Sequence, residues 1–313
     1  MNDRLKLPPE RDFKFYQRRK HDKWREVAVP EPALEASVAD SHAHIHMLPD
    51  PAHELARCAA NGVDYVCMIT DPSEDGTRPF DELAAWQTNS EVQVDVRIAV
   101  GVHPHNAKLY TLVMEQELCA RLGDPRVGAL GEIGLDYHYD LSPRDVQREV
   151  FCRQIEIAQE KGLPIVLHLR GGEDPDCDNA HREAFELLKE TNALGPRTLL
   201  HCCALPPDEL RPWVEADCFV AYGGALTFKN ADVAREGACL VPVERLMLET
   251  DAPYMTPEPM RGAACTPAHV VFTAAALAEV RGVAPGDARR NFLEQLHANT
   301  VRFYNKATEE ALA

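Results

Sequence analysis

Six residues of the 313-residue sequence have the types and positions expected of metal ligands: His42, His44, Glu132, His168, His201 and Asp251. His42 and His44 are two residues apart, so on an extended strand both imidazoles face the same side and can share one cation. Neutral imidazole suits zinc, manganese and similar ions. Four histidines and two carboxylates suit two divalent ions about 3.5–4 Å apart, the spacing of hydrolytic two-metal clusters.

Each of these signals has a plainer alternative. Glu132 lies inside an apolar run, where an unpaired carboxylate would be costly, so it either pairs with an arginine or bridges two cations. His168 and His201 each end an apolar run, as a core histidine can. Asp251 is interpreted as a ligand that also accepts a proton from the attacking water, or as part of a helix N-terminal turn.

Four further residues are candidates for support or substrate contact. His103 and His105 follow an apolar run and either contact substrate or shape their loop. Glu249 is expected to orient a ligating histidine from outside the metal site. Arg261 is a candidate for contact with a phosphate.

The elements that must position these residues form a regular pattern after residue 35. Short apolar runs alternate with amphipathic stretches, for example Pro143–Lys161, in which Gly162 is expected to end a helix. Eight runs read as strands buried on both faces: Ala36–Ser41, Tyr65–Thr70, Val96–Val102, Val127–Ile133, Pro164–Leu169, Arg197–His201, Cys218–Tyr222 and Leu246–Thr250.

This order predicts an α/β fold, a single (β/α)₈ TIM barrel over residues 36–313 with an N-terminal extension over residues 1–35. Helices near Pro267–Val280 and Asp287–Tyr304 would close it. In such a barrel the active site lies at the carboxyl ends of the strands, where the six residues fall. An open, doubly wound sheet is the competing fold, but it would place a site at one switch point.

Composition limits the partners. The formal net charge of −17 repels polyanions, so an anionic substrate must be held locally by cations. Met1–Glu26 differs, with nine Lys or Arg against five acids, and is either a basic arm for nucleic acid or a solvated or packed extension. Without an apolar run of membrane length or a secretory signal, the expected location is cytoplasmic, with the nucleus as an alternative.

The motifs around these residues resemble those of the TatD family, in order and in spacing, from about residue 36 to Tyr304. The segments that carry the resemblance are Asp40-Ser41-His42-Ala43-His44, Gly101-Val102-His103-Pro104-His105, Gly131-Glu132-Ile133-Gly134-Leu135-Asp136, Leu167-His168, Leu200-His201-Cys202 and Glu249-Thr250-Asp251-Ala252-Pro253-Tyr254.

The resemblance implies a metal-dependent deoxyribonuclease that removes nucleotides from a 3′ end, with DNA as substrate and Mg²⁺, Mn²⁺ or Zn²⁺ as cofactors. By position, one ion would be bound by His42, His44 and Asp251. The other would be bound by His168 and His201, with Glu132 between the two ions.

Two departures from the family pattern concern the substrate and not the metals. The chain has about 35 residues before its first strand, and the Arg-Asn-x-Pro segment that often follows the last ligand is replaced by a segment that begins at Arg261 and has no Asn. A hydrolase of a non-nucleic ester, lactone or amide is therefore the alternative function. A binding or scaffolding protein on the same barrel is the third, and the complete ligand set argues against it.

Overall fold

The computed structural model describes residues 13–19, 23–28, 34–88, 94–174 and 178–305. Eight parallel strands lie side by side in chain order. Their bounds are β3 Val38–Ala43, β4 Val63–Thr70, β5 Asp95–Val100, β6 Val127–Asp136, β7 Ile165–Arg170, β8 Thr198–Leu200, β9 Phe219–Tyr222 and β10 Leu246–Leu248. The two edges meet just beyond β10, where Ala43 pairs with Ala252 and the Asp251 N–H donates to the His42 carbonyl over 2.9 Å. The predicted (β/α)₈ barrel is confirmed.

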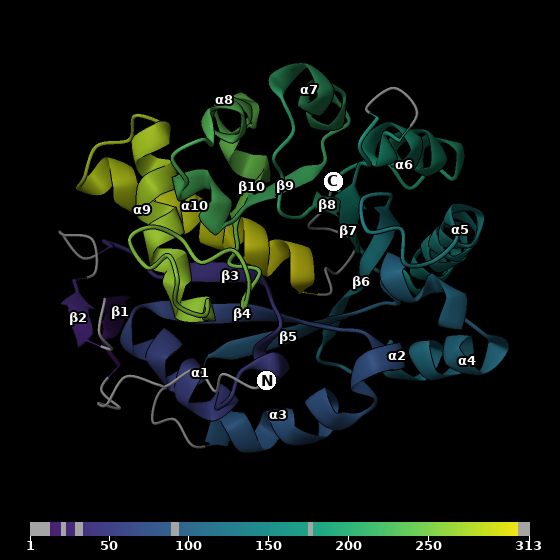
Figure 1. Ribbon diagram of the computed structural model, residues 1–313, viewed down its shortest axis with the longest axis horizontal. Helices are drawn as coiled ribbons and strands as arrows, with labels where there is room; N and C mark the ends of the chain where they lie inside the picture. Colours follow the sequence, from purple (N-terminus) through teal and green to yellow (C-terminus); the bar gives the residue numbers. More distant parts are fainter. Residues whose placement is uncertain (1–12, 20–22, 29–33, 89–93, 175–177, 306–313) are drawn as a thin grey trace.

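Helices surround the strands (Figure 1). They are α1 Pro51–Ala60, α2 Pro72–Asp75, α3 Arg78–Thr88, α4 Leu112–Arg121, α5 Arg144–Lys161, α6 Ala180–Glu190, α7 Pro207–Glu215, α8 Asp232–Leu240, α9 Val270–Val280 and α10 Asp287–Tyr304. Short 3₁₀ turns include η2 Ile45–Met47, η3 Pro104–Leu109, η4 Gly224–Thr227, η5 Val243–Arg245 and η6 Pro267–His269. The helix predicted from Pro143 begins one residue later, because Pro143 is its N-cap, and it ends as expected at Gly162 in the left-handed conformation.

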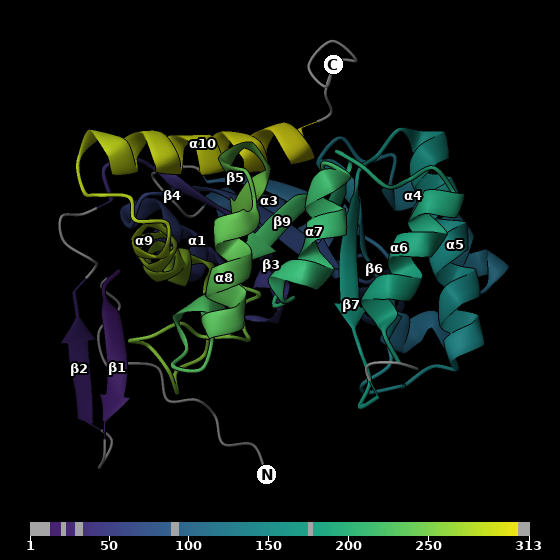
Figure 2. The same ribbon diagram turned by 90° about the horizontal axis from the view of Figure 1, so that it is seen from above.

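The barrel interior is a packed core and not a pore. Small and large apolar side chains from all eight strands fill it, among them Ala39, Ile69, Val166 and Phe219. Phe303 and Tyr304 of α10 complete this cluster. Figure 2 shows α10 lying across the end of the barrel that is opposite the end toward which the β7 arrow points. The carboxyl ends of the strands therefore form an open mouth, and α10 covers the floor.

Part of the N-terminal extension packs against the barrel as an antiparallel hairpin, β1 Phe15–Arg19 and β2 Lys23–Val27. The Phe15 ring is only 1% exposed and meets Phe272 of α9 edge-on, with ring centroids 5.0 Å apart. The side-chain amide of Gln17 donates to the Pro259 carbonyl, in the loop after β10, over 2.6 Å. Division of the chain into an extension and a barrel at residue 35 stays a prediction.

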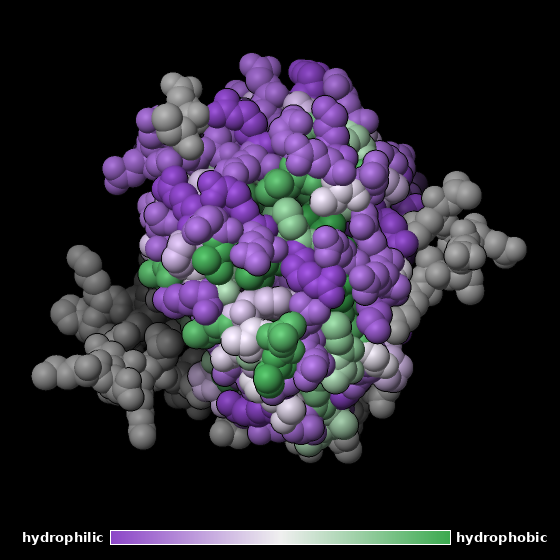
Figure 3. All heavy atoms as spheres, turned by 90° about the vertical axis from the view of Figure 1, so that its right-hand side faces the viewer, coloured by the Kyte–Doolittle hydropathy of each residue, from purple (hydrophilic) through white to green (hydrophobic). Residues whose placement is uncertain are grey.

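The surface is mainly hydrophilic on the face seen in Figure 3, with hydrophobic patches between the polar side chains. Among the helices that the structure describes, none has the length and apolar character needed to cross a membrane.

Candidate metal centre

The six predicted ligands lie together at the mouth of the barrel. His42 is in β3, Glu132 in β6 and His168 in β7, while His201 and Asp251 come just after β8 and β10. A cavity of about 460 Å³, here called the metal cavity, is lined by five of the six, and by His103, His105, Arg170 and Tyr254. His42 is fully buried next to it.

Asp251 faces the two histidines of β3 and its continuation. Its Oδ1 atom lies 3.8 Å from His42 Nε2 and 3.6 Å from His44 Nε2. These distances are too long for hydrogen bonds. Two ligand atoms that each lie about 2.1 Å from one zinc ion would be roughly 3.4–3.8 Å apart at coordination angles of about 110–130°. The spacing of these three groups therefore fits a cation between them.

Glu132 connects this group to the other two histidines. One oxygen, Oε1, lies 3.6 Å from His44 Nε2. The other, Oε2, lies 3.2 Å from His168 Nδ1 and 3.1 Å from His201 Nε2. Oε2 also lies 3.7 Å from His42 Nε2, so Oε1 is on the side of His44 and Oε2 on the side of the other three histidines. A carboxylate surrounded in this way can bridge two ions through its two oxygens.

The burial of His42 supports the same interpretation. Neither of its ring nitrogens has a hydrogen-bond partner among the described residues, and its ring stacks on that of His201 at 3.9 Å between centroids. Burial lowers the pKa of His42 well below its ordinary value, so the imidazole is neutral, which is the form that binds metals. A buried polar atom without a partner is costly, and a cation would remove part of that cost.

Asp136 sets the orientation of His168. Its Oδ2 atom accepts from His168 Nε2 over 3.1 Å and from His105 Nε2 over 2.9 Å. Burial alone would raise the pKa of Asp136, but these hydrogen bonds lower it well below the usual range. His168 Nε2 donates to Asp136, and in the neutral ring that binds a metal the lone pair is on Nδ1, the nitrogen that lies 3.2 Å from Glu132 Oε2. Carboxylate–histidine–metal contacts have this form.

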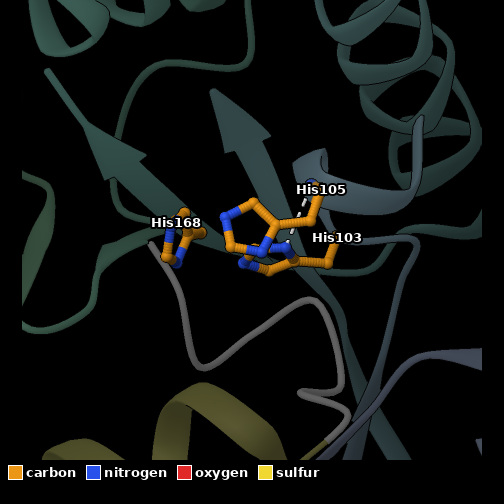
Figure 4. A group of neighbouring side chains, drawn as sticks. All are labelled: His103, His105 and His168. Carbon is orange, nitrogen blue, oxygen red and sulfur yellow. Dashed lines mark hydrogen bonds between the residues drawn. The ribbon is translucent and has the colours of Figure 1, made fainter. Parts of the chain in front are cut away.

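His103, His105 and His168 form a second cluster of imidazoles, whose ring nitrogens lie within 4.8 Å of one another (Figure 4). A hydrogen bond decides the role of His103 in it, because His103 Nδ1 accepts from the His105 backbone N–H over 3.1 Å. The proton of the neutral ring is then on Nε2, since burial and the nearby His168 hold the His103 pKa well below its ordinary value. His103 Nε2 is therefore a donor and not a ligand.

Two further buried carboxylates, Glu249 and Asp40, lie next to the predicted ligands His201 and His42. Glu249, predicted to orient a histidine, is fully buried; its Oε1 accepts from the Cys202 N–H over 2.6 Å and its Oε2 lies 3.7 Å from His201 Nδ1. The pKa of Glu249 is raised, with burial as the largest cause and His201 opposing it. Asp40 accepts from the His42 N–H over 3.1 Å and from the Thr250 N–H over 2.9 Å. Asp40 was not among the predicted site residues, although it precedes His42 by two positions on the same strand.

Arg261 lies outside the residues that line the metal cavity. It lines a neighbouring cavity together with Phe228 and Lys229. Contact between Arg261 and a substrate phosphate stays a prediction.

Comparison with known proteins identifies the family. The model of the TatD related DNase family matches residues 39–305. The chain belongs to this family. A TatD relative from Bacillus subtilis, the uncharacterized metal-dependent hydrolase YabD, is 32% identical over 248 residues, which are 77% of this chain and 90% of that protein.

A second TatD relative bears a more specific name. The 3′-5′ ssDNA/RNA exonuclease TatD of Enterobacter lignolyticus is 34% identical over 161 residues, 51% of this chain and 59% of that protein. Among solved structures, the TatD homologue YjjV of Escherichia coli K12 has a TM-score of 0.73 and 25% identity, and the match covers 86% of this chain and 98% of YjjV. These TatD relatives support a metal-dependent hydrolase and leave the substrate of this chain to be determined.

Proposed function

We propose that this TatD protein hydrolyses phosphodiester bonds of DNA from the 3′ end, with two divalent ions held by His42, His44, Glu132, His168, His201 and Asp251. The observation that carries the proposal is the position of Glu132, whose Oε1 faces His44 and whose Oε2 faces His42, His168 and His201, so that one carboxylate is within reach of all four histidines. Two divalent ions bound there would lower the pKa of an attacking water and offset the charge that develops on the phosphate.

Asp251 is the candidate proton acceptor. Its backbone has a left-handed φ of 56° and its N–H is bonded to the His42 carbonyl, so the carboxylate is held at the edge of the metal cavity. Its side chain is partly exposed to that cavity, whereas His42 is fully buried. A water molecule in the metal cavity can therefore reach the Asp251 carboxylate and transfer a proton to it directly.

Groups on the opposite wall can hold the anionic substrate. The Nε2–H of His103 is a neutral donor, and Arg170 adds a cation to the cavity lining. The Arg170 guanidinium lies 4.7 Å from the centre of the Tyr139 ring, which is 53% exposed. Tyr254, 51% exposed, lines the same cavity from the loop after β10. Exposed aromatic rings beside phosphate-binding cations are typical of sites that bind single strands by base stacking.

The test is hydrolysis of single-stranded DNA labelled at one end. With Mg²⁺, Mn²⁺ or Zn²⁺, we expect a 5′-labelled strand to shorten one nucleotide at a time, and EDTA to stop the reaction. A 3′-labelled strand should release its label as a mononucleotide at once. Release of the 3′ label on fragments of several nucleotides would show internal cleavage and would contradict attack from the 3′ end.

The net charge of −17 favours one alternative, a small ester, lactone or amide as substrate. An acidic surface repels a polyanion but not a small neutral molecule. DNA that stays intact while a small ester or lactone is hydrolysed in a metal-dependent reaction would establish that alternative.

A further inference from the structure

A second cavity opens beside the metal cavity, between the loops that follow β8, β9 and β10. It has a volume of about 530 Å³ and is here called the side cavity; its lining includes Ala204, Phe228, Lys229, Asn230, Glu258 and Arg261. Glu258 is three residues after Met255, which lines the metal cavity. Three residues span at most about 11 Å. The two cavities are thus neighbours at the mouth of the barrel.

Arg261 is placed in this cavity by an aromatic ring. Its guanidinium carbon lies 3.9 Å from the centre of the Phe228 ring. Among the described residues, no acceptor forms a hydrogen bond with the N–H groups of Arg261. Stacking fixes the plane of a guanidinium and leaves its edge, which carries the N–H donors, free for a phosphate. Lys229 adds a second exposed cation, against the single carboxylate of Glu258.

Two of the loops that form the side cavity, those after β9 and β10, are held against each other by close contacts. The Glu258 N–H donates to the Thr227 hydroxyl over 2.8 Å, and a Cβ atom at Gly224 would lie only 1.9 Å from the Met255 carbonyl oxygen. The Arg235 guanidinium donates to the carbonyls of Leu226 and Phe228 over 3.0 and 2.9 Å. Binding groups held in this way lose little conformational freedom when a ligand arrives.

The charged part and the apolar part of the lining each suit a different part of a nucleotide. Two cations lie at the rim for the phosphate, and the alanines at positions 204, 225 and 231 form an apolar wall with Phe228 for a base. The chain has a net charge of −17 and repels a polyanion over most of its surface, so a polyanion can be held only where local cations such as Arg261 and Lys229 offer hydrogen-bond donors.

We infer that the side cavity binds a further, internal nucleotide of the strand whose 3′-terminal phosphodiester lies in the metal cavity, with its phosphate on Arg261 and Lys229. This inference rests on the proposed nuclease function. The chain between Met255 and Glu258 spans at most about 11 Å, which corresponds to no more than about three nucleotides at the 3.4 Å advance per nucleotide of a duplex strand. A dinucleotide would therefore fill the metal cavity alone, and a hexanucleotide would fill both cavities.

The experiment compares oligothymidylates of two and six nucleotides as substrates of the unaltered protein and of Arg261→Met. We expect the unaltered protein to have a higher kcat/KM for the hexanucleotide, and Arg261→Met to lower the ratio of the two values by about tenfold. The dependence of log KM on log salt concentration for the hexanucleotide should become shallower by about 0.7, the loss of one phosphate contact on a single strand.

Arg290→Met is the matched control. It removes the same charge from an exposed arginine of α10, at the floor of the barrel, where it pairs with Asp287 at 3.2 Å. It should change neither the ratio nor the salt dependence. An unchanged ratio in Arg261→Met would overturn the inference, and so would an equal fall with Arg290→Met. If the unaltered protein cleaved neither oligonucleotide with any of the three metals, the proposed function itself would fail.

Discussion

The two ends of the barrel differ in how they treat buried polar groups. At the floor, the Tyr304 hydroxyl donates to the Ser41 carbonyl over 2.7 Å, and the Asn299 amide donates to the carbonyls of Val243 and Leu246 over 2.7 and 2.8 Å. At the mouth, both ring nitrogens of His42 and the Nδ1 of His201 have no hydrogen-bond partner among the described residues.

This difference separates a structural end from a functional end. The Tyr304 and Asn299 side chains at the floor are satisfied within the chain and help to fasten α10 to the strands. The unpartnered imidazole nitrogens at the mouth lower the stability of the fold relative to apolar side chains, and a bound cation would offset this loss. Changes at the mouth should therefore reduce activity and metal binding, while changes at the floor should reduce stability.

The largest expected effect is at the mouth. Asp251→Asn keeps the shape of the side chain but removes a charged ligand and the proposed proton acceptor, so kcat for DNA should fall by roughly 10³-fold or more. The melting temperature should change little. The control is Asp287→Asn at the exposed start of α10, which should retain full activity. Near-normal turnover by Asp251→Asn would remove the basis for the proposed mechanism.

The counterpart at the floor is Phe303→Ala. This buried ring packs on Phe219 in the barrel interior, with centroids 5.3 Å apart, and its loss should cost about 3–5 kcal/mol of unfolding free energy. Denaturant titration measures this loss, and kcat per folded molecule should be retained. Leu112→Ala, at a side chain that is 80% exposed, should have almost no effect. A Phe303→Ala protein that is stable but inactive would blur the separation of the two ends.

Asp136 tests the support of the ligands and not the ligands themselves. Asp136→Asn weakens the hydrogen bond that orients His168, so metal affinity should fall by about 10–100-fold, a smaller loss than at a ligand. Competition with a chelator of known affinity measures it. Added metal should restore much of the activity of Asp136→Asn, and failure of any metal concentration to do so would assign Asp136 a role in the reaction itself.

The smallest expected effect is on stability as a function of pH, through the pair of Glu35 and Arg289 at the floor. Hydrogen bonds from Arg289 lower the pKa of Glu35 from 4.5 to about 2. A carboxyl group with a lowered pKa stabilises the folded state above its unfolded pKa, and this contribution disappears as the pH falls toward 2. The unaltered protein should therefore be more stable than Glu35→Gln at pH 7, with a gap that narrows between about pH 5 and pH 3.

Urea titrations at pH 7, 5 and 3 would measure that gap, with Glu279→Gln as the matched surface control. A gap of constant size over this range would show that Glu35 acts through packing alone.

The contrast between the ends also explains what the sequence could predict. Strands such as β6 and helices such as α10 follow from runs of apolar residues, and His42 or Glu132 can be recognised because polar residues end or interrupt those runs. The hydrogen bonds of Asp136 could not be predicted, since they join the end of β6 to side chains of η3 and β7 that are 31 and 32 residues away in the chain. Nor could the stacking of Arg261 on Phe228, which depends on how two mouth loops fold against each other.

The most direct test of the central claim is a count of bound metal ions. Protein freed of metal and titrated with Mn²⁺ should bind two ions per chain, close enough for their spins to couple in the electron paramagnetic resonance spectrum. Glu132→Ala should bind at most one ion tightly and lose the coupled signal while it stays folded. Two coupled ions in Glu132→Ala, or no tight Mn²⁺ binding by the unaltered protein, would contradict the account.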